Sequence, residues 1–159
     1  MALYDSLTKL ANRKLLQEKW KFLLAEAKRY NRKIAIAFLD LNDFKYINDT
    51  YGHHIGDKLL KWFSSKLLEI TRETDVVSRI GGDEFLILFD EAIENKEIYK
   101  QRIQERLITN RFKTNNISID VSSSIGIAMY PTDSEKFDEL IEIADKLMYE
   151  DKQHKIRNS

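Results

Sequence analysis

The stretch Arg79-Ile80-Gly81-Gly82-Asp83-Glu84-Phe85 decides the fold, because two glycines and two acids stand between two apolar runs. Val76-Val77 precedes the glycines, and Phe85-Leu86-Ile87-Leu88-Phe89 follows the acids. Such flanks around a Gly-Gly pair predict a β-hairpin, since glycine tolerates the positive φ that a two-residue turn requires. Asp and Glu are poor strand formers, yet here they open the most apolar strand of the chain. Two carboxylates beside bare backbone indicate a site for a metal and phosphates.

A further acid favours this interpretation over an ordinary hairpin with solvated carboxylates. The apolar run from Ile34 to Leu39 predicts a strand buried on both faces, and therefore a central one, which ends on Asp40. If this strand pairs with the hairpin, Asp40 and Asp83 meet at one end of the sheet. One or two carboxylates commonly hold Mg²⁺ and leave positions for water and substrate phosphates. The pattern is typical of phosphoryl transfer.

The composition predicts one globular domain with no global affinity for polyanions. The chain has 159 residues, of which 33% are charged, and its 26 Lys and Arg balance its 26 Asp and Glu. We therefore expect no nucleic-acid partner and no membrane contact by this domain. Because it has no cysteine, signal peptide or long apolar run, a cytoplasmic location is expected. The start at Met1-Ala2-Leu3 suggests a piece excised from a longer signalling protein, whose parent could be membrane-anchored.

Helical periodicity brackets the first predicted strand. Before the strand, the periodicity predicts a helix that ends at about Tyr30. After the strand, turn formers mixed with aromatics predict a short helix that ends at Gly52. A strong helix follows, with Asp57 in its first turn, where an acid is favourable. The hairpin strands are expected at roughly Asp75 to Ile80 and Glu84 to Phe89.

The second half of the chain predicts two more helices around one more strand region. A helix is expected from about Asn95 to Phe112. The alternating run Ile117 to Val121 continues to Met129 as one long strand or as two strands with a bulge. The last helix carries a 3-4 apolar stripe. The order β α β β α β, with extra helices, predicts a ferredoxin-like, palm-type α+β fold: a central, mostly antiparallel sheet surrounded by helices, as in nucleotide cyclases.

Six motifs, in order along nearly the whole chain, resemble the GGDEF domain family, the diguanylate cyclases. The signature is Gly81-Gly82-Asp83-Glu84-Phe85. The other five segments are Asp5-Ser6-Leu7-Thr8-Lys9-Leu10-Ala11-Asn12-Arg13, Asp40-Leu41-Asn42-Asp43-Phe44-Lys45-Tyr46-Ile47-Asn48-Asp49, Gly52-His53-His54-Ile55-Gly56-Asp57, Ser124-Ile125-Gly126-Ile127-Ala128 and Ala144-Asp145-Lys146-Leu147-Met148-Tyr149.

The resemblance implies condensation of two GTP molecules into cyclic di-GMP with release of two pyrophosphates. It implies that Asp40, Asp83 and the Leu41 carbonyl ligate Mg²⁺, with Mn²⁺ as a possible substitute, and that Asp83 or Glu84 assists deprotonation of the attacking 3′-hydroxyl. Loss of a metal carboxylate should nearly abolish such chemistry. A palm-type nucleotidyl transferase or mononucleotide cyclase of another kind is a remoter alternative.

The resemblance also implies a nucleotide-binding role for five residues. Asn48 and Asp57 match the positions that read guanine, although each could instead cap a turn or a helix. Phe44 lies in the same matched segment and is expected at the substrate. Lys45 and Lys152 match phosphate-contacting lysines, although a solvated lysine is the ordinary interpretation of either.

The last helix departs from the family pattern. Where the family commonly reads A-K-x-x-G-R-N, this chain reads Asp151-Lys152-Gln153-His154-Lys155-Ile156-Arg157-Asn158. The glycine is missing and the arginine stands one place late. Either Lys155 or Arg157 could replace the family's arginine, and the sequence leaves that contact open.

The segment Arg72-Glu73-Thr74-Asp75 matches the R-x-x-D of the family's inhibitory product-binding site. The resemblance therefore implies that Arg72 and Asp75 bind cyclic di-GMP and that the bound product slows turnover. The plain alternative is a solvated turn between a helix and a strand.

The stoichiometry of the implied reaction requires a homodimer, because one guanine site holds one GTP and the product needs two. The opening helix is too short for a long coiled coil, so we expect the isolated domain to be largely monomeric. An N-terminal sensor or receiver domain of the parent protein would supply the dimer contact. The rival hypothesis is a catalytically silent GGDEF-type domain that binds GTP or cyclic di-GMP as a sensor.

Overall fold

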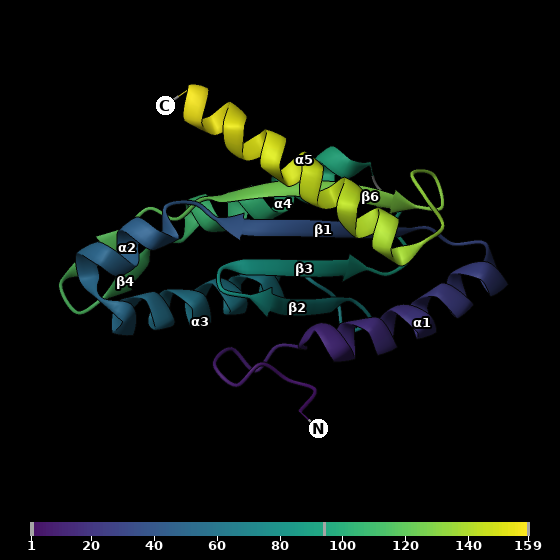
Figure 1. The fold of residues 1–159 in the computed structure, drawn as a ribbon, viewed down its shortest axis with the longest axis horizontal. Helices are drawn as coiled ribbons and strands as arrows, with labels where there is room; N and C mark the ends of the chain where they lie inside the picture. Colours follow the sequence, from purple (N-terminus) through teal and green to yellow (C-terminus); the bar gives the residue numbers. More distant parts are fainter. Residues whose placement is uncertain (1, 94, 159) are drawn as a thin grey trace.

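The computed structural model of this chain describes residues 2–93 and 95–158 and has the predicted α+β architecture (Figure 1). The elements in chain order are α1 (Arg13–Tyr30), β1 (Ile34–Leu41), α2 (Phe44–Tyr51), α3 (His53–Glu69), β2 (Val76–Gly81), β3 (Glu84–Phe89), α4 (Lys96–Thr109), β4 (Phe112–Thr114), β5 (Ile117–Ile119), β6 (Ser123–Tyr130) and α5 (Phe137–Arg157).

The central sheet has the strand order β2-β3-β1-β6, and each neighbouring pair is antiparallel. β1 lies between β3 and β6, and all eight of its residues are buried. The predicted central strand and its pairing with the hairpin are therefore confirmed. The register places Asp40 opposite Glu84 on one side and opposite Ser124 on the other.

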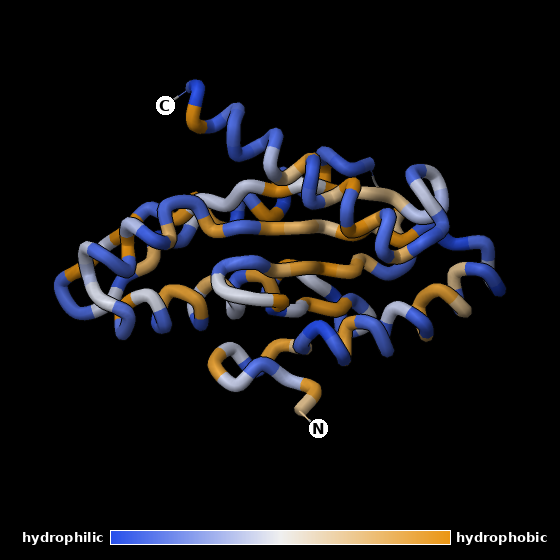
Figure 2. Tube along the Cα trace, in the orientation of Figure 1, coloured by the Kyte–Doolittle hydropathy of each residue, from blue (hydrophilic) through white to orange (hydrophobic). Residues whose placement is uncertain are grey.

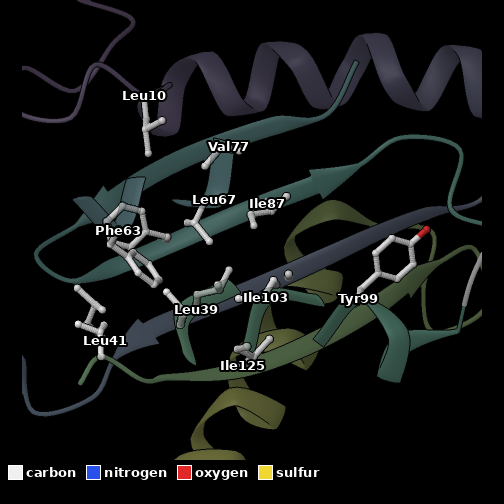
Figure 3. Close-up of a cluster of buried hydrophobic side chains, with 14 of the residues drawn as sticks. Leu10, Leu39, Leu41, Phe63, Leu67, Val77, Ile87, Tyr99, Ile103 and Ile125 are labelled. Atoms are coloured by element: carbon white, nitrogen blue, oxygen red, sulfur yellow. The ribbon is translucent and has the colours of Figure 1, made fainter. Parts of the chain in front are cut away.

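Alternate residues of β1 supply two hydrophobic clusters on opposite faces of the sheet, as the period of two in a strand requires. Ile34, Ile36 and Phe38 pack with α1 and α5, whereas Ala35, Ala37 and Leu39 belong to the cluster that includes buried residues of α3 and α4 (Figure 3). The hydropathy trace shows the apolar segments concentrated in the strands and the polar segments along the outer helices (Figure 2). Helices on both faces therefore bury the sheet.

The packing of α5 on β6 is unusually close. A Cβ placed on Gly126 of β6 would lie 2.0 Å from the carbonyl oxygen of Ala144 and 2.3 Å from the backbone nitrogen of Met148. Only glycine allows this approach of two backbones. It fixes the position of α5, whose C-terminal half carries the predicted phosphate-contacting lysine.

The predicted hairpin is present, but its turn is shifted by one residue. Gly81 pairs with Glu84, so the two turn residues are Gly82 and Asp83 rather than the two glycines. Gly82 has the positive φ, +44°, and the register shifts between Arg79 and Gly81. Asp83 therefore lies in the turn, and only Glu84 opens the strand.

Two predicted boundaries in the second half of the chain are wrong. α4 ends at Thr109, and Phe112 begins a short strand that pairs with β5 as a separate two-stranded sheet. The expected run from Ile117 to Met129 is consequently two strands in different sheets. Asn115, with φ of +50°, allows a tight local hairpin between β4 and β5, which separates β5 from β6.

Asp57 is the fifth residue of α3, beyond the first turn in which it was expected. The helix begins directly at His53, because Gly52, with φ of +92°, ends α2 and starts α3 without a longer connection. No described helix is long and apolar enough to cross a membrane.

Candidate active site

Three segments meet at one end of the central sheet: the end of β1, the turn between β2 and β3, and the C-terminal half of α5 (Figure 1). The backbone N–H of Leu41 donates to the carbonyl of Asp83 over 3.3 Å, which joins the end of β1 to the turn. Lys152 of α5 reaches the same place, with its Nζ 2.9 Å from Oδ2 of Asp40. The structure thus brings together the predicted metal-binding segment, the signature and one predicted phosphate-binding lysine.

Asp83 in the turn and Glu84 at the start of β3 are difficult to ionise in this setting. Burial, followed by the proximity of the Asp40 carboxylate, raises the pKa of Asp83 to about 7. Burial and the negative charges of Asp40 and Asp145 likewise raise the pKa of Glu84. Like charges held together in a half-buried site disfavour the charged form. The cluster is short of positive charge even with Lys152 present.

The donor set fits a hard divalent cation. Asp40 is buried, and its Oδ1 has no hydrogen-bond partner in the described structure. A buried carboxylate oxygen without a partner is costly, and a cation between Asp40 and Asp83 would satisfy it and relieve their repulsion. Among the described residues there is no group of three or more acidic, His or Cys side chains suited to a metal. Carbonyl, water or phosphate oxygens would have to complete the shell, which is typical of Mg²⁺.

The loop after β1 is clamped against β6. The Asn42 side chain donates to Ser122 Oγ over 2.8 Å and accepts from Ser124 Oγ over 2.7 Å, and its backbone N–H donates to the Ser122 carbonyl. Asp43 adopts the left-handed conformation, with φ of +61°, before α2 begins. This loop forms one wall of a 340 Å³ pocket lined by Asn42, Asp43, Ser122, Lys152, Lys155 and Ile156.

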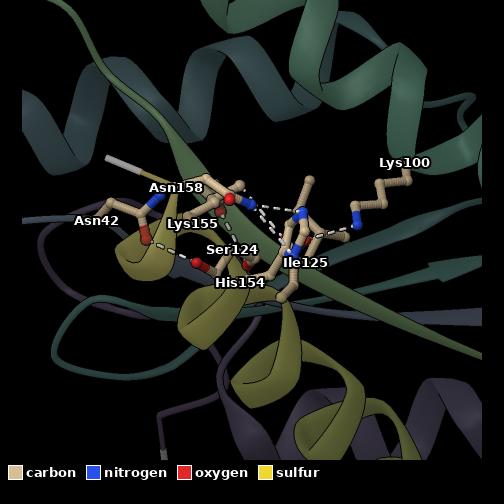
Figure 4. A network of polar contacts seen from close by, with 9 residues as sticks. Asn42, Lys100, Ser124, Ile125, His154, Lys155 and Asn158 are labelled. Atoms are coloured by element: carbon tan, nitrogen blue, oxygen red, sulfur yellow. Dashed lines mark hydrogen bonds and ion pairs between the residues drawn. The ribbon is translucent and has the colours of Figure 1, made fainter.

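The structure shows which of Lys155 and Arg157 lies at this pocket. Lys155 lines this pocket and donates to the Ser123 carbonyl (Figure 4), whereas Arg157 is exposed in the last turn of the helix. Lys155, rather than Arg157, is therefore placed beside Lys152.

Asn48 has an unusual environment on α2. Its Oδ1 is buried and has no partner among the described residues. A Cβ on Gly56 of α3 would lie 1.8 Å from that oxygen, so the glycine leaves the space that the Asn48 amide occupies. Neither of the capping roles considered from the sequence is present, because Asn48 lies within α2 and Asp57 is exposed inside α3. An unpaired buried amide oxygen is instead suited to accept from a ligand.

The other two residues expected at the nucleotide differ in exposure. Phe44 is the first residue of α2 and packs partly against the core. Lys45 is 92% exposed and lies 3.3 Å from Asp49 one turn later. Among the described residues, this ion pair with Asp49 is the contact that Lys45 makes, and it does not direct Lys45 toward the pocket.

Arg72 and Asp75 lie at the opposite end of β2 from the Gly82-Asp83 turn. Only 2% of the Asp75 side chain is exposed, and its carboxylate accepts from the backbone N–H groups of Arg72 and Asp90 and from the Arg72 guanidinium. Arg72 also donates to the Asp90 carbonyl and keeps 53% of its side chain exposed. Asp75 thus orders this turn, and Arg72 is the member that a ligand could reach.

Sequence reasoning did not find Tyr99 and Arg102 of α4, which line the same 210 Å³ pocket as Arg72. The Arg102 guanidinium lies 5.5 Å from the centre of the Tyr99 ring. An aromatic ring and two arginines are chemically suited to a nucleobase and a phosphate. No local motif could have indicated these residues, because their helix follows the R-x-x-D segment by some twenty positions.

The opening motif also has a role that its sequence did not reveal. Asp5 accepts from the backbone and hydroxyl of Thr8 and from Arg79 Nη1 over 3.1 Å, while Arg79 Nε donates to the Gly82 carbonyl over 2.9 Å. One arginine therefore ties the N-terminal turn to the turn that carries Asp83.

The antiparallel sheet presents paired carboxylates at its strand ends beside Lys152 and Lys155, an arrangement chemically suited to a divalent cation and to phosphate oxygens. The family model "Diguanylate cyclase, GGDEF domain" matches residues 2–158. The chain belongs to this family.

Relatives and solved structures agree with that assignment. The diguanylate cyclase DosC of Escherichia coli (strain K12) is 39% identical over 147 residues, which are 91% of this chain and 32% of DosC. The GGDEF domain of TpbB (YfiN) from Pseudomonas aeruginosa matches with a TM-score of 0.89 and 30% identity, covering 95% of this chain and 89% of that one. The GGDEF domain of DgcB from Caulobacter crescentus, solved in complex with c-di-GMP, has a TM-score of 0.83 and 28% identity, covering 97% and 92%. The chain thus spans less than a third of the length of DosC.

Proposed function

We propose that this domain is a diguanylate cyclase that condenses two GTP into cyclic di-GMP and two pyrophosphates. The observation that carries the proposal is the proximity of Asp40 to the Asp83 turn, where a buried carboxylate oxygen of Asp40 has no hydrogen-bond partner among the described residues. Family membership supports the same activity. The intact acids speak against a silent sensor domain.

Asp40, Asp83 and the Leu41 carbonyl would hold Mg²⁺, or Mn²⁺ in its place. Bound there, the ion would neutralise phosphate charge and favour the ionised 3′-hydroxyl. Asp83 or Glu84 would take the proton of that hydroxyl. Burial and neighbouring acids raise the pKa of both carboxyls, that of Asp83 to about 7, and a raised pKa makes a carboxylate a stronger general base. The chain itself would orient the triphosphate through Lys152 and the clamped loop after β1.

Guanine would be read by Asn48 and Asp57, with Phe44 beside the nucleotide and Lys45 free to reach a phosphate. The unpaired Asn48 oxygen supports the first of these roles, because guanine offers N–H donors that adenine lacks at the same edge. The active species would be a homodimer with a GTP on each domain. We place it in the cytoplasm, attached to an N-terminal sensor or receiver domain that promotes pairing.

The pocket at Arg72 supports product inhibition as a further part of the proposal. Arg72 and Arg102 would offer positive charge to cyclic di-GMP, with the buried Tyr99 ring packed beside Arg102 and Asp75 holding the turn. DgcB, a structural neighbour, was solved with that nucleotide. Arg72→Ala should raise the product concentration needed to halve the rate at least tenfold, whereas inhibition that is unchanged would remove this site from the proposal.

The activity itself is tested by incubating concentrated protein with GTP and Mg²⁺ and resolving the nucleotides by chromatography with mass detection. We expect cyclic di-GMP from the wild type and a loss of at least a hundredfold in Asp83→Ala, because the variant lacks one of two charges that would hold the metal. Lys146→Ala, a change at an exposed position of α5, serves as the control and should leave the rate unchanged. Binding of GTP without any product would favour the sensor hypothesis, and undiminished product from Asp83→Ala would exclude the metal assignment.

A further inference from the structure

A buried carboxylate joins three elements beside the 340 Å³ pocket. Asp151 of α5 is 10% exposed, and its Oδ1 accepts from Lys100 Nζ of α4 over 2.7 Å. Its Oδ2 accepts from the backbone N–H of Ile125 on β6 over 2.9 Å. Burial alone would raise the pKa of Asp151, but the hydrogen bonds from Lys100 and Ile125 outweigh burial and lower it. Asp151 is therefore an ionised group with a fixed position.

Lys155 follows Asp151 by one helical turn, and its Nζ lies 3.3 Å from Asp151 Oδ2. The same ammonium group donates to the carbonyl of Ser123, and Figure 4 shows Lys155 on the side of the helix that faces β6. An ammonium group has three donors, and these two contacts account for two of them. One third of the Lys155 side chain is exposed, 33%, where it lines the pocket. The remaining donor is available to a ligand there.

Asp151 and Lys155 both stand where this chain differs from the family pattern that it resembles. Asp151 and Lys155 occupy the positions at which A-K-x-x-G-R-N has its alanine and its glycine. Residues i and i+4 of a helix are neighbours, and the structure shows that the two departures contact each other. A lysine on a flexible stem is by default solvated. Here Lys155 is restrained by Asp151, whose carboxylate accepts hydrogen bonds from Lys100 and from Ile125.

We propose that Lys155 binds the polyphosphate of the nucleotide and that Asp151 is the positioning residue that holds Lys155 at the pocket. The inference rests on the proposed function for the identity of the nucleotide. An anion in this pocket would lie between the ammonium groups of Lys152 and Lys155 and the clamped loop at Asn42 and Asp43. Lys155 thus takes over a contact for which the chain has no arginine at the usual place.

The test measures affinity rather than turnover, with α,β-methylene GTP as the probe, because its P–C–P link cannot release pyrophosphate. Titration calorimetry in Mg²⁺ should show about a tenfold loss of affinity for Lys155→Met, the equivalent of one charge-assisted hydrogen bond. Affinity for guanosine, which has no phosphate, should stay within twofold. Lys155→Arg should retain affinity for the analogue within threefold, and Lys146→Met, an exposed lysine of the same helix, should match the wild type.

The role of Asp151 is tested by a double-mutant cycle. Asp151→Asn should weaken binding of the analogue severalfold in the wild type and have no further effect in Lys155→Met, because its influence acts through Lys155. Urea unfolding of each variant monitors stability. Three results would overturn the proposal. The first is an equal loss of affinity for guanosine and for the analogue, and the second is additive effects of the Asp151 and Lys155 changes on affinity. The third is a larger loss of affinity in Arg157→Met than in Lys155→Met.

The failure of this proposal differs from the failure of the proposed function. Absence of cyclic di-GMP with binding of the analogue intact would remove the cyclase activity alone. Normal turnover and analogue binding in Lys155→Met would remove the phosphate contact alone. Wild-type protein that does not bind the analogue would overturn both.

Discussion

At the scale of single residues, the site is defined by groups that the protein leaves unsatisfied. The Oδ1 atoms of Asp40 and Asn48 are buried without partners among the described residues, on either side of the loop after β1. Stable cores rarely tolerate such groups. Asp40 and Asn48 are the residues proposed to bind the metal and guanine, and such ligands would complete the hydrogen bonding of these two oxygens.

The raised pKa of Asp83 predicts how pH changes stability in the absence of metal. The carboxyl titrates near 7 in the folded state and near its ordinary 3.8 when unfolded, so the folded state binds the extra proton between these values. Stability from this group is therefore lost as pH rises from about 4 to 7, and the effect levels off above 7. Urea unfolding in EDTA should show that the free energy of unfolding falls more between pH 5 and pH 8 in the wild type than in Asp83→Asn.

Mg²⁺ provides the complementary measurement. Added at pH 8, the ion should restore part of the lost stability of the wild type, because it binds only the ionised pair. Mg²⁺ should raise the free energy of unfolding of Asp83→Asn by less than that of the wild type. An equal pH slope in both proteins would show that Asp83 is not the group that titrates.

At the scale of elements, α5 is positioned by its contact with β6. Gly126 lets the backbone of the helix approach the strand, and this placement brings Lys152 to Asp40 and Lys155 to the pocket. The hairpin is held in a comparable way, by Arg79 between Asp5 and the Gly82 carbonyl. The geometry of the candidate active site thus depends on two contacts between elements rather than on any one element.

Gly126→Ala should destabilise the protein by about 2–3 kcal/mol, because the added methyl group would meet backbone atoms that cannot rotate away. Gly81→Ala is the matched control. Its Cβ would meet nothing within 4 Å, and we expect a change below about 0.5 kcal/mol. Urea unfolding of both variants makes the comparison. Similar losses of unfolding free energy in the two would show that the close approach of α5 and β6 does not require a glycine.

At the scale of the whole molecule, the proposed reaction needs a second copy, because the proposed active site of one domain would hold one GTP and the product contains two nucleotides. The N-terminal turn connects to the catalytic hairpin through Asp5 and Arg79. A domain attached before residue 2 would therefore be joined directly to the segment that orients Asp83.

Specific activity should rise with protein concentration, since dimers form by mass action. Fusion of a parallel dimeric coiled coil before Ala2 should raise the rate at 1 μM at least tenfold by increasing the effective concentration of the partner. A fusion of equal length with a monomeric helix is the control. A specific activity that is constant across the concentration range would contradict a dimeric active species, provided that sedimentation shows monomers throughout.

Much of the fold could be predicted from the sequence, and so could the meeting of Asp40 with the Asp83 turn at one end of the sheet. The continuous apolar run to Asp40 predicted a buried central strand, and the signature predicted a hairpin, because both patterns are local consequences of strand and turn chemistry. The wrong predictions also have local causes, because a competing turn or strand pairing formed instead of the expected one. Asn115 allowed β4 and β5 to pair with each other, and the turn of the signature took Gly82 and Asp83 instead of both glycines.

What the sequence by itself determined is the set of elements and the chemical groups at the ends of the strands, since periodicity and turn residues act over a few positions. Only the tertiary structure decided which of Lys155 and Arg157 faces the pocket, and that Tyr99 and Arg102 lie beside Arg72. It also placed the Asp151 carboxylate, which Lys100 and Ile125 contact, 3.3 Å from the ammonium group of Lys155. These facts depend on the register of β1 with its neighbours and on the packing of α4 and α5 against the sheet. Contacts between elements far apart in the chain arise from packing, which no local pattern specifies.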